Sequence, residues 1–159
     1  DPTQTFQAVR YLMGNLNISG YSPILWSLAL LIVASCAFAW LPRSLNLLSV
    51  STESAATRGV DVTKTQRIAF LSASLATGAA VSLGGPIGFV GIVVPHMVRL
   101  MVGADHRVVL PASAFMGATF LVICDVAART LMSPQELPVG VITAMLGGPF
   151  FLWLLVRRV

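Results

Sequence analysis

Long apolar runs separated by short polar segments dominate the sequence. Asp, Glu, Lys and Arg are missing from four stretches, which cover residues 11–42, 68–98, 108–124 and 137–156. A transmembrane helix needs about 17–25 predominantly apolar residues, and each stretch is long enough to supply one. The pattern therefore predicts an all-α integral membrane protein, in which a polytopic bundle of helices crosses the bilayer.

Glycine and proline divide the second stretch, which is too long for one ordinary span. Gly84-Gly85-Pro86 interrupts it, with Gly88 and Gly91 just beyond, so we expect two spans joined by a tight break. About five transmembrane helices are predicted, at residues 24–42, 66–84, 87–102, 109–131 and 138–156. Because the links between the later spans are short, consecutive helices should pack as antiparallel neighbours.

A polar segment, residues 43–65, follows the first span and is the substantial extramembrane part of the chain. It should contain a short helix, because Ser51 or Thr52 supplies the hydroxyl of a helix N-cap. Gly59 can end that helix, since glycine readily adopts the left-handed conformation found beyond a helix C-terminus.

A second helix start follows Gly59. Asp61 or Thr63 can cap it, which would give two short helices hinged at the glycine. Such a pair is typical of a docking surface on the cytoplasmic face. A solvated loop with incidental helicity fits the same residues equally well.

The basic residues predict the orientation of the bundle. Cytoplasmic loops of membrane proteins carry an excess of Lys and Arg. With residues 43–65 in the cytoplasm, eight of the 10 basic residues fall on that side, namely Arg43, Arg58, Lys64, Arg67, Arg99, Arg107, Arg157 and Arg158. Arg10 and Arg129 fall on the other side.

Composition agrees with a membrane location and excludes several functions. Of 159 residues, 56% are hydrophobic and 10% are charged, whereas soluble domains carry about 25% charged residues. The net charge of +4 comes from scattered residues without the basic stripe that binds nucleic acid, so no nucleic-acid partner is expected. Cys36 and Cys124 lie in apolar runs, and no catalytic motif occurs, so we expect neither a metal site nor an enzyme. Because Asp1 stands where a Met would, and no signal-peptide pattern follows, we expect a piece of a longer protein.

Several segments, in order along nearly the whole chain, resemble those of one known family. Glu53-Ser54-Ala55-Ala56, followed by Gly59, is similar to the coupling motif of binding-protein-dependent ABC permeases. The other segments are Leu45-Asn46-Leu47-Leu48, Gly85-Pro86-Ile87-Gly88-Phe89-Val90-Gly91, Val94-Pro95-His96 with Arg99, Asp105-His106-Arg107, Leu110-Pro111, Asp125 with Ala128-Arg129, and Glu136-Leu137-Pro138-Val139-Gly140-Val141. Together they resemble the C-terminal half of ABC importer permeases for iron-siderophores, haem and cobalamin.

The resemblance implies how energy would reach the chain. Residues 52–62 would form paired coupling helices against a cytoplasmic ATP-binding cassette subunit, which would bind ATP and Mg²⁺ and hydrolyse the nucleotide. This chain would be a transport subunit and would bind no cofactor. The residues assigned to the contact are Glu53, Ala55, Ala56, Arg58, Gly59 and Val60. Ser54 is a mild departure, since the family usually has a second Glu, an Ala or a similar small residue there.

Arg129 is the candidate contact for a partner outside the cytoplasm. In the resembling family an arginine at this place meets a glutamate of the soluble binding protein that delivers the substrate, so Arg129 and Glu136 are assigned to docking. Asp125 lies four residues before Arg129 on the same helical face, which also fits a structural ion pair. Glu136 fits a cap of the following span better, because Pro138 lies just beyond it.

The resemblance also implies a translocation path. It would run between two permease copies, a homodimer or paired halves, in a bacterial inner membrane, along residues 138–151. The residues assigned to the path or to helix breaks are Gly84, Gly85, Pro86, Gly88, Gly91, Pro138, Gly140 and Gly147. Close helix packing explains the glycines equally well. The apolar lining does not distinguish an iron-siderophore, the first choice, from haem or cobalamin.

Half of an ion-gradient-driven secondary transporter is the alternative function. Discontinuous helices of such proteins would match the glycine break at residues 84–91. Asp125, however, is the only carboxylate well inside a predicted span, which is few for ion coupling. His96 fits a structural role near the interface, and His106 fits a solvated cytoplasmic turn.

Overall fold

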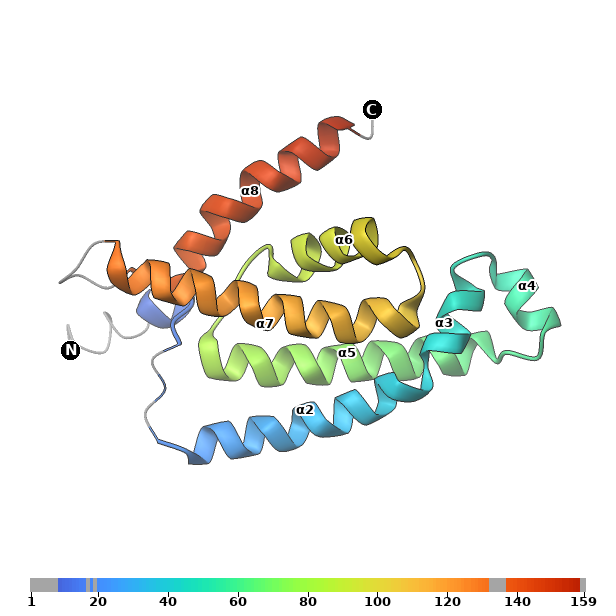
Figure 1. Ribbon diagram of the computed structural model, residues 1–159. Helices are drawn as coiled ribbons and strands as arrows, with labels where there is room; N and C mark the ends of the chain where they lie inside the picture. Colours follow the sequence, from blue (N-terminus) through green and yellow to red (C-terminus); the bar gives the residue numbers. More distant parts are fainter. Residues whose placement is uncertain (1–8, 17, 19, 132–136, 158–159) are drawn as a thin grey trace.

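The computed structural model describes residues 9–16, 18, 20–131 and 137–157, which contain helices and no strand (Figure 1). A helical turn at residues 9–12 comes first. The helices that follow are α2 (Ser22–Trp40), α3 (Pro42–Leu48), α4 (Thr52–Thr57), α5 (Val62–Gly84), α6 (Val90–Val102), α7 (His106–Thr130) and α8 (Val139–Arg157). The all-α fold class predicted from the apolar runs is confirmed.

Four of these helices, α2, α5, α7 and α8, are long and apolar enough to cross a membrane. The other expected span, residues 87–102, forms α6, whose 13 residues reach about 20 Å and fall short of a bilayer core. Gly85 and Phe89 have positive φ angles of 71° and 66°, and the residues between them are not helical, so α6 starts only at Val90. The expected tight break is therefore a longer non-helical segment.

The polar segment also differs from the expected pair of helices around Gly59. The Ser51 Oγ caps α4 by accepting from the Ser54 N–H over 2.9 Å. Asp61 then caps α5, whose 23 residues continue from the polar segment into the span. The residues after Gly59 thus belong to α5, and the short helices that contact each other are α3 and α4.

The helices pack as two groups. In the first group α2 lies against α5, and in the second group α6, α7 and α8 contact one another. Two clusters of buried side chains stabilise the second group: Cys124, Ala128, Val139 and Ile142 join α7 to α8, and Val94, Val98 and Val109 join α6 to α7. The outer faces keep large apolar side chains exposed, as Trp26 illustrates at 74%, which suits lipid or another helix rather than water.

Residues 9–16 contact the end of α5 that lies away from α3 and α4. The Tyr11 hydroxyl donates to the Val81 carbonyl over 2.8 Å, and the Asn15 N–H donates to the Gly84 carbonyl over 2.9 Å. The second of these bonds satisfies a carbonyl that the end of a helix would otherwise leave unpaired.

Two glycines allow the backbone of this segment to come close. A Cβ at Gly85 would overlap the Tyr11 carbonyl, and a Cβ at Gly140 in α8 would overlap the Met13 carbonyl. Both glycines were assigned to the path or to helix breaks, and in the structure they permit close packing. Their role in a path stays a prediction.

Replacing Gly140 with alanine should lower the stability of the protein, because the new methyl group meets the Met13 carbonyl. Overpacking of this kind costs about 1–3 kcal/mol. Gly148→Ala is the matched control: it lies in the same helix with open space around it, and it should be neutral or stabilise the helix by about 0.5–1 kcal/mol. Thermal unfolding of the purified protein in detergent measures both changes, and equal midpoints would contradict the packing.

Candidate functional site

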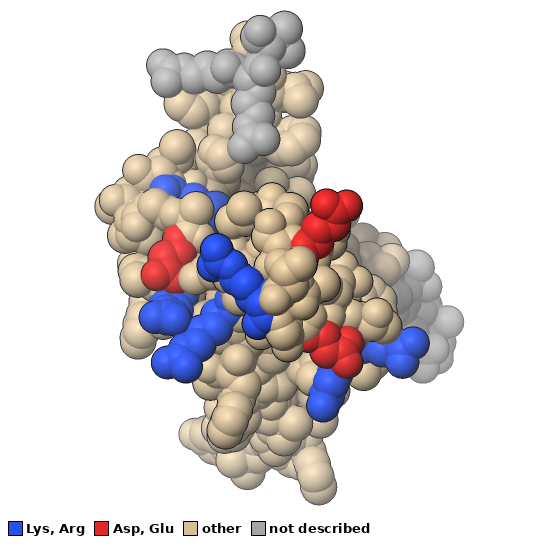
Figure 2. Space-filling view, turned by 90° about the vertical axis from the view of Figure 1, so that its right-hand side faces the viewer, with Lys and Arg blue, Asp and Glu red and all other residues tan. Residues whose placement is uncertain are grey.

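Charged residues gather at one end of the bundle, which we call the basic end. It comprises α3, α4, the first turns of α5 and α7, and residues 103–105 between α6 and α7. Figure 2 views this end and shows Lys and Arg side chains interspersed with Asp and Glu. The basic residues on these elements and at the end of α6 are Arg43, Arg58, Lys64, Arg67, Arg99 and Arg107. Arg10 and Arg129 lie on residues 9–12 and in the last turn of α7, at the opposite end, as the charge pattern predicted.

The C-terminus of α4 depends on the backbone conformation of Gly59. The Gly59 N–H donates to the Ala56 carbonyl and the Val60 N–H to the Ala55 carbonyl, each over 3.0 Å. With Gly59 at φ 81°, this is a Schellman motif, and the predicted left-handed end of the helix is confirmed. Nothing lies within 4 Å of a Cβ at Gly59, so the position requires a conformation rather than space.

Burial divides the six residues assigned to the ATPase contact. Ala55 is fully buried and Val60 is half-buried, so both support α4 from within. The exposed residues are Glu53, Ala56, Arg58 and Gly59. Within the described part of the chain, the outer surface of α4 is open to a partner.

Asn46 joins α3 to the N-terminus of α7. Its Nδ2 donates to the Asp105 Oδ1 over 2.6 Å, and its Oδ1 accepts from the His106 backbone N–H over 2.8 Å. The His106 Nδ1 lies 2.7 Å from the same amide oxygen, which only accepts, so this ring nitrogen carries a proton. Asp105 also accepts from the Arg107 N–H over 2.9 Å as the N-cap of α7.

The charge of Asp105 fixes the orientation of the Asn46 amide. The Arg107 backbone N–H, and after it the Asn46 side chain, hold the pKa of the Asp105 carboxyl below its ordinary value. An ionised carboxylate only accepts hydrogen bonds, so it faces the NH₂ group of Asn46 and leaves the amide oxygen to His106. The stabilisation of the fold by the ionised Asp105 is complete above the ordinary pKa of an aspartate. It is lost as the pH falls through the lowered pKa of Asp105.

Sequence reasoning missed this cluster. It predicts a solvated turn at His106, whereas the structure places that residue half-buried and bonded to Asn46. Asp105 carried a local signal, because an aspartate before an apolar run is a typical N-cap. Asn46 and Asp105 both lie in segments that resemble the family, but nothing in the sequence pairs them, since they are 59 residues apart.

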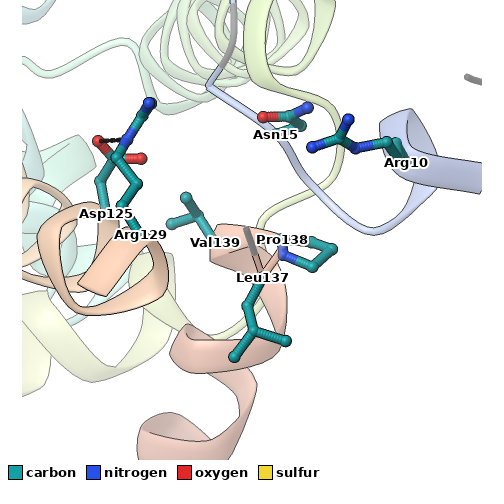
Figure 3. Close-up of a pocket in the computed structure, with 7 residues that line it drawn as sticks. All are labelled: Arg10, Asn15, Asp125, Arg129, Leu137, Pro138 and Val139. Atoms are coloured by element: carbon teal, nitrogen blue, oxygen red, sulfur yellow. Dashed lines mark hydrogen bonds and ion pairs between the residues drawn. The ribbon is translucent and has the colours of Figure 1, made fainter. Parts of the chain in front are cut away.

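At the opposite end, Arg129 forms the intrahelical ion pair that its spacing predicts. Its Nε donates to the Asp125 Oδ2 over 2.9 Å, with 42% of the Arg129 and 24% of the Asp125 side chain exposed. The pair borders a cavity of about 10 Å³, whose other lining residues are Arg10, Asn15, Leu137, Pro138 and Val139 (Figure 3). This cavity has room for about one water molecule and none for a substrate. Glu136 lies outside the described residues.

An open hollow of about 590 Å³ contains three of the assigned path residues. It is lined by Leu12, Met13, Pro86, Gly88, Gly140, Val141, Ala144 and Met145, none of which is charged. Three other assigned residues lie elsewhere: Gly84 is buried against Leu16, Gly91 faces open space, and Pro138 borders the small cavity at Arg129.

Gly147 forms a notch in α8 that receives Phe89. A Cβ at Gly147 would overlap the Phe89 side chain, so the close approach requires glycine. Phe89 itself has a φ of 66°, a conformation that non-glycine residues rarely adopt. The sequence suggested a path role for Gly147 and gave none to Phe89.

The described residues show no metal site. No group of His, Cys, Asp and Glu in this part of the chain is arranged to hold a metal ion. Both cysteines are free thiols, with Cys36 exposed and Cys124 buried.

Four helices of spanning length, a capped helix at a basic end and an uncharged hollow along α8 define the class: a multi-pass membrane protein with one polar, basic end. The chain belongs to the FecCD transport family, whose sequence profile matches residues 1–157. The family resemblance of the sequence motifs is therefore confirmed.

The relatives include permease proteins of transport systems. The chain is similar to the cobalamin import system permease protein BtuC of Halobacterium salinarum, at 48% identity over 95% of this chain and 40% of that protein. It is 43% identical to the hemin transport system permease protein HmuU of Yersinia pestis, over 99% of this chain and 47% of that protein. A solved structure, described as an inward-facing conformation of a metal-chelate type ABC transporter, matches with a TM-score of 0.81 and 34% identity, over 99% of this chain and 49% of that one. The chain thus spans somewhat under half the length of these proteins.

Proposed function

We propose that the chain is the C-terminal half of a permease subunit in a binding-protein-dependent ABC importer for an iron-siderophore, haem or cobalamin type of chelate. The relatives named for cobalamin and hemin and the metal-chelate transporter structure support this cargo class. ATP and Mg²⁺ would bind a separate ATPase subunit. The observation that carries the proposal is α4, a short helix capped at both ends whose outer surface is exposed at the basic end.

Helix α4 would be the contact for the ATPase. By the positive-inside rule the basic end would face the cytoplasm, where such a subunit would sit. Because α4 is fixed by Ser51 at one end and by Gly59 at the other, it would move as a unit. It contacts α3 and α5, so a displacement of its outer surface would reach both helices.

The opposite end would face the substrate-binding protein outside the cytoplasm. Arg129 would meet an acidic side chain of that protein, and its partial exposure in the last turn of α7 supports this role. The ion pair to Asp125 would hold the guanidinium in place. Glu136 is proposed to take part in the same contact.

The path would form between the two permease copies of a homodimer in a bacterial inner membrane. The open hollow beside α8 supports this placement, together with the exposed apolar side chains of Met145 at 68% and Leu152 at 61%. Pro86, Gly88 and Gly140 would lie along the path. An uncharged lining suits a bulky chelate that the binding protein has already selected.

Replacing Gly59 tests the ATPase contact. Valine at φ 81° costs about 1–2 kcal/mol, so Gly59→Val should lower uptake and stimulated ATP hydrolysis roughly 5–30-fold while the protein still inserts. Gly59→Asn is the matched control, because asparagine tolerates this conformation, and it should keep most activity. Uptake of cobalamin, hemin and ferric citrate into proteoliposomes with the complete importer measures both variants.

The same assay separates the importer from a secondary transporter. Uptake that needs no ATP and is unchanged in Gly59→Val would contradict the proposal and favour transport driven by an ion gradient.

Arg129→Glu should weaken binding of the loaded binding protein by about tenfold or more, since a rim charge of the wrong sign repels its partner. Basal ATP hydrolysis should stay unchanged. The double variant Asp125→Arg/Arg129→Asp keeps an intrahelical ion pair but moves the positive charge by one turn. If docking needs Arg129 itself, the double variant stays weak; if the pair is only structural, it recovers binding. Surface plasmon resonance on the reconstituted importer distinguishes these outcomes.

A further inference from the structure

In the described part of the chain, the two groups of helices are joined at two places: at the basic end through α3, and at the opposite end through residues 9–16, which contact both α5 and α8. Among the described helices, α2 and α5 form one group and α6, α7 and α8 form the other. Helix α3 belongs to neither group, and it contacts α2 and α5 of the first and α7 of the second. Since α3 also contacts α4 and α5, it connects the proposed ATPase contact to the group that contains α8.

Between α2 and α7 the groups are separated by a groove of about 620 Å³. Its lining residues are Ser35, Phe38, Ala39, Pro42, His106, Arg107, Leu110, Pro111 and Ala114. Side chains of the two long helices therefore do not interlock here, and the groove reaches His106, where the bonds to Asn46 begin. A displacement of α3 would therefore reach α7 directly through the bonds of Asn46.

The contact at Asn46 is specific rather than loose packing. One amide group bonds the N-cap carboxylate, the first backbone N–H and the imidazole of α7 at distances of 2.6, 2.8 and 2.7 Å. Hydrogen bonds to charged groups are about twice as strong as those between neutral ones, and the bond to Asp105 is of that kind. Such a contact keeps the N-terminus of α7 bonded to α3 when either helix is displaced.

We propose that Asn46 is the positioning residue through which a displacement of α4 reaches α7, and with it the group that contains α8. This inference rests on the proposed importer function and adds the route that energy takes inside the permease. Asn46 touches neither the cargo nor the nucleotide. It acts by keeping the N-terminus of α7 attached to α3 in every state of the transport cycle.

Exchanging the amide and the carboxylate between Asn46 and Asp105 tests the inference in the complete importer. Asn46→Asp places a second carboxylate beside Asp105, which breaks the hydrogen bond between residues 46 and 105. Asn46→Asp/Asp105→Asn restores it, because the new amide donates to the new carboxylate and asparagine still caps α7. Ser49→Ala is the matched control, since the Ser49 hydroxyl bonds only the Asn46 carbonyl within α3 among the described residues.

The readout is the number of cargo molecules taken up per ATP hydrolysed in proteoliposomes, with cobalamin, hemin or ferric citrate as the probe, whichever the unaltered importer takes up. Asn46→Asp should lower this ratio by about fivefold or more, the lower range of coupling between sites, with basal ATP hydrolysis retained. The double variant should recover the ratio to within about twofold, and Ser49→Ala should keep it.

Three results would overturn the inference. In the first, Asn46→Asp keeps the normal ratio, which means that other contacts of the whole permease join the groups. In the second, uptake and hydrolysis fall together with the amount of assembled complex, which means that Asn46 serves folding alone. In the third, the double variant stays as uncoupled as Asn46→Asp. Absence of ATP-dependent uptake by the unaltered importer would instead contradict the proposed function.

Discussion

Inside a bilayer every backbone N–H and C=O must find a partner within the protein, and the rest of the structure depends on this constraint. Helices meet it along the spans, which is why the uncharged stretches become α2, α5, α7 and α8. The constraint leaves the first N–H groups of each helix to be satisfied by side chains. At the basic end Ser51, Asp61, Asp105 and Asn46 supply these acceptors. At this end the polar chemistry is therefore concentrated where helices begin, beside the proposed ATPase contact.

Features whose physical cause is local could be predicted from the sequence. The apolar runs predicted the long helices, and the four-residue spacing of Asp125 and Arg129 predicted their ion pair. Gly59 was predicted to end α4 because a left-handed residue after a helix favours glycine, and the structure has that conformation. In each case the residues that decide the outcome belong to one continuous stretch of the sequence.

Features that depend on distant residues could not be predicted. The role of Asn46 requires α3 to lie beside the start of α7, and no residue near Asn46 in the sequence indicates this. Gly85 and Gly140 are needed because the backbone of residues 9–16 packs against them, yet glycine has the same appearance in a sequence whether it serves a turn, a pore or a close contact. The length of α6 was overestimated for a related reason: positive φ angles at Gly85 and Phe89 stop the helix, and neither angle follows from apolar periodicity.

The packing of the Phe89 ring into the notch at Gly147 restricts how α8 can move. A ring held from the side in a gap along a helix prevents that helix from sliding along its own axis unless the ring withdraws. Tilting or rolling about the contact meets no such obstacle. Phe89 has a φ of 66° and lies directly between the non-helical residues 85–88 and the start of α6. Because Gly147 lies near the middle of α8, a tilt about this contact would displace the two ends of the helix by similar distances in opposite directions.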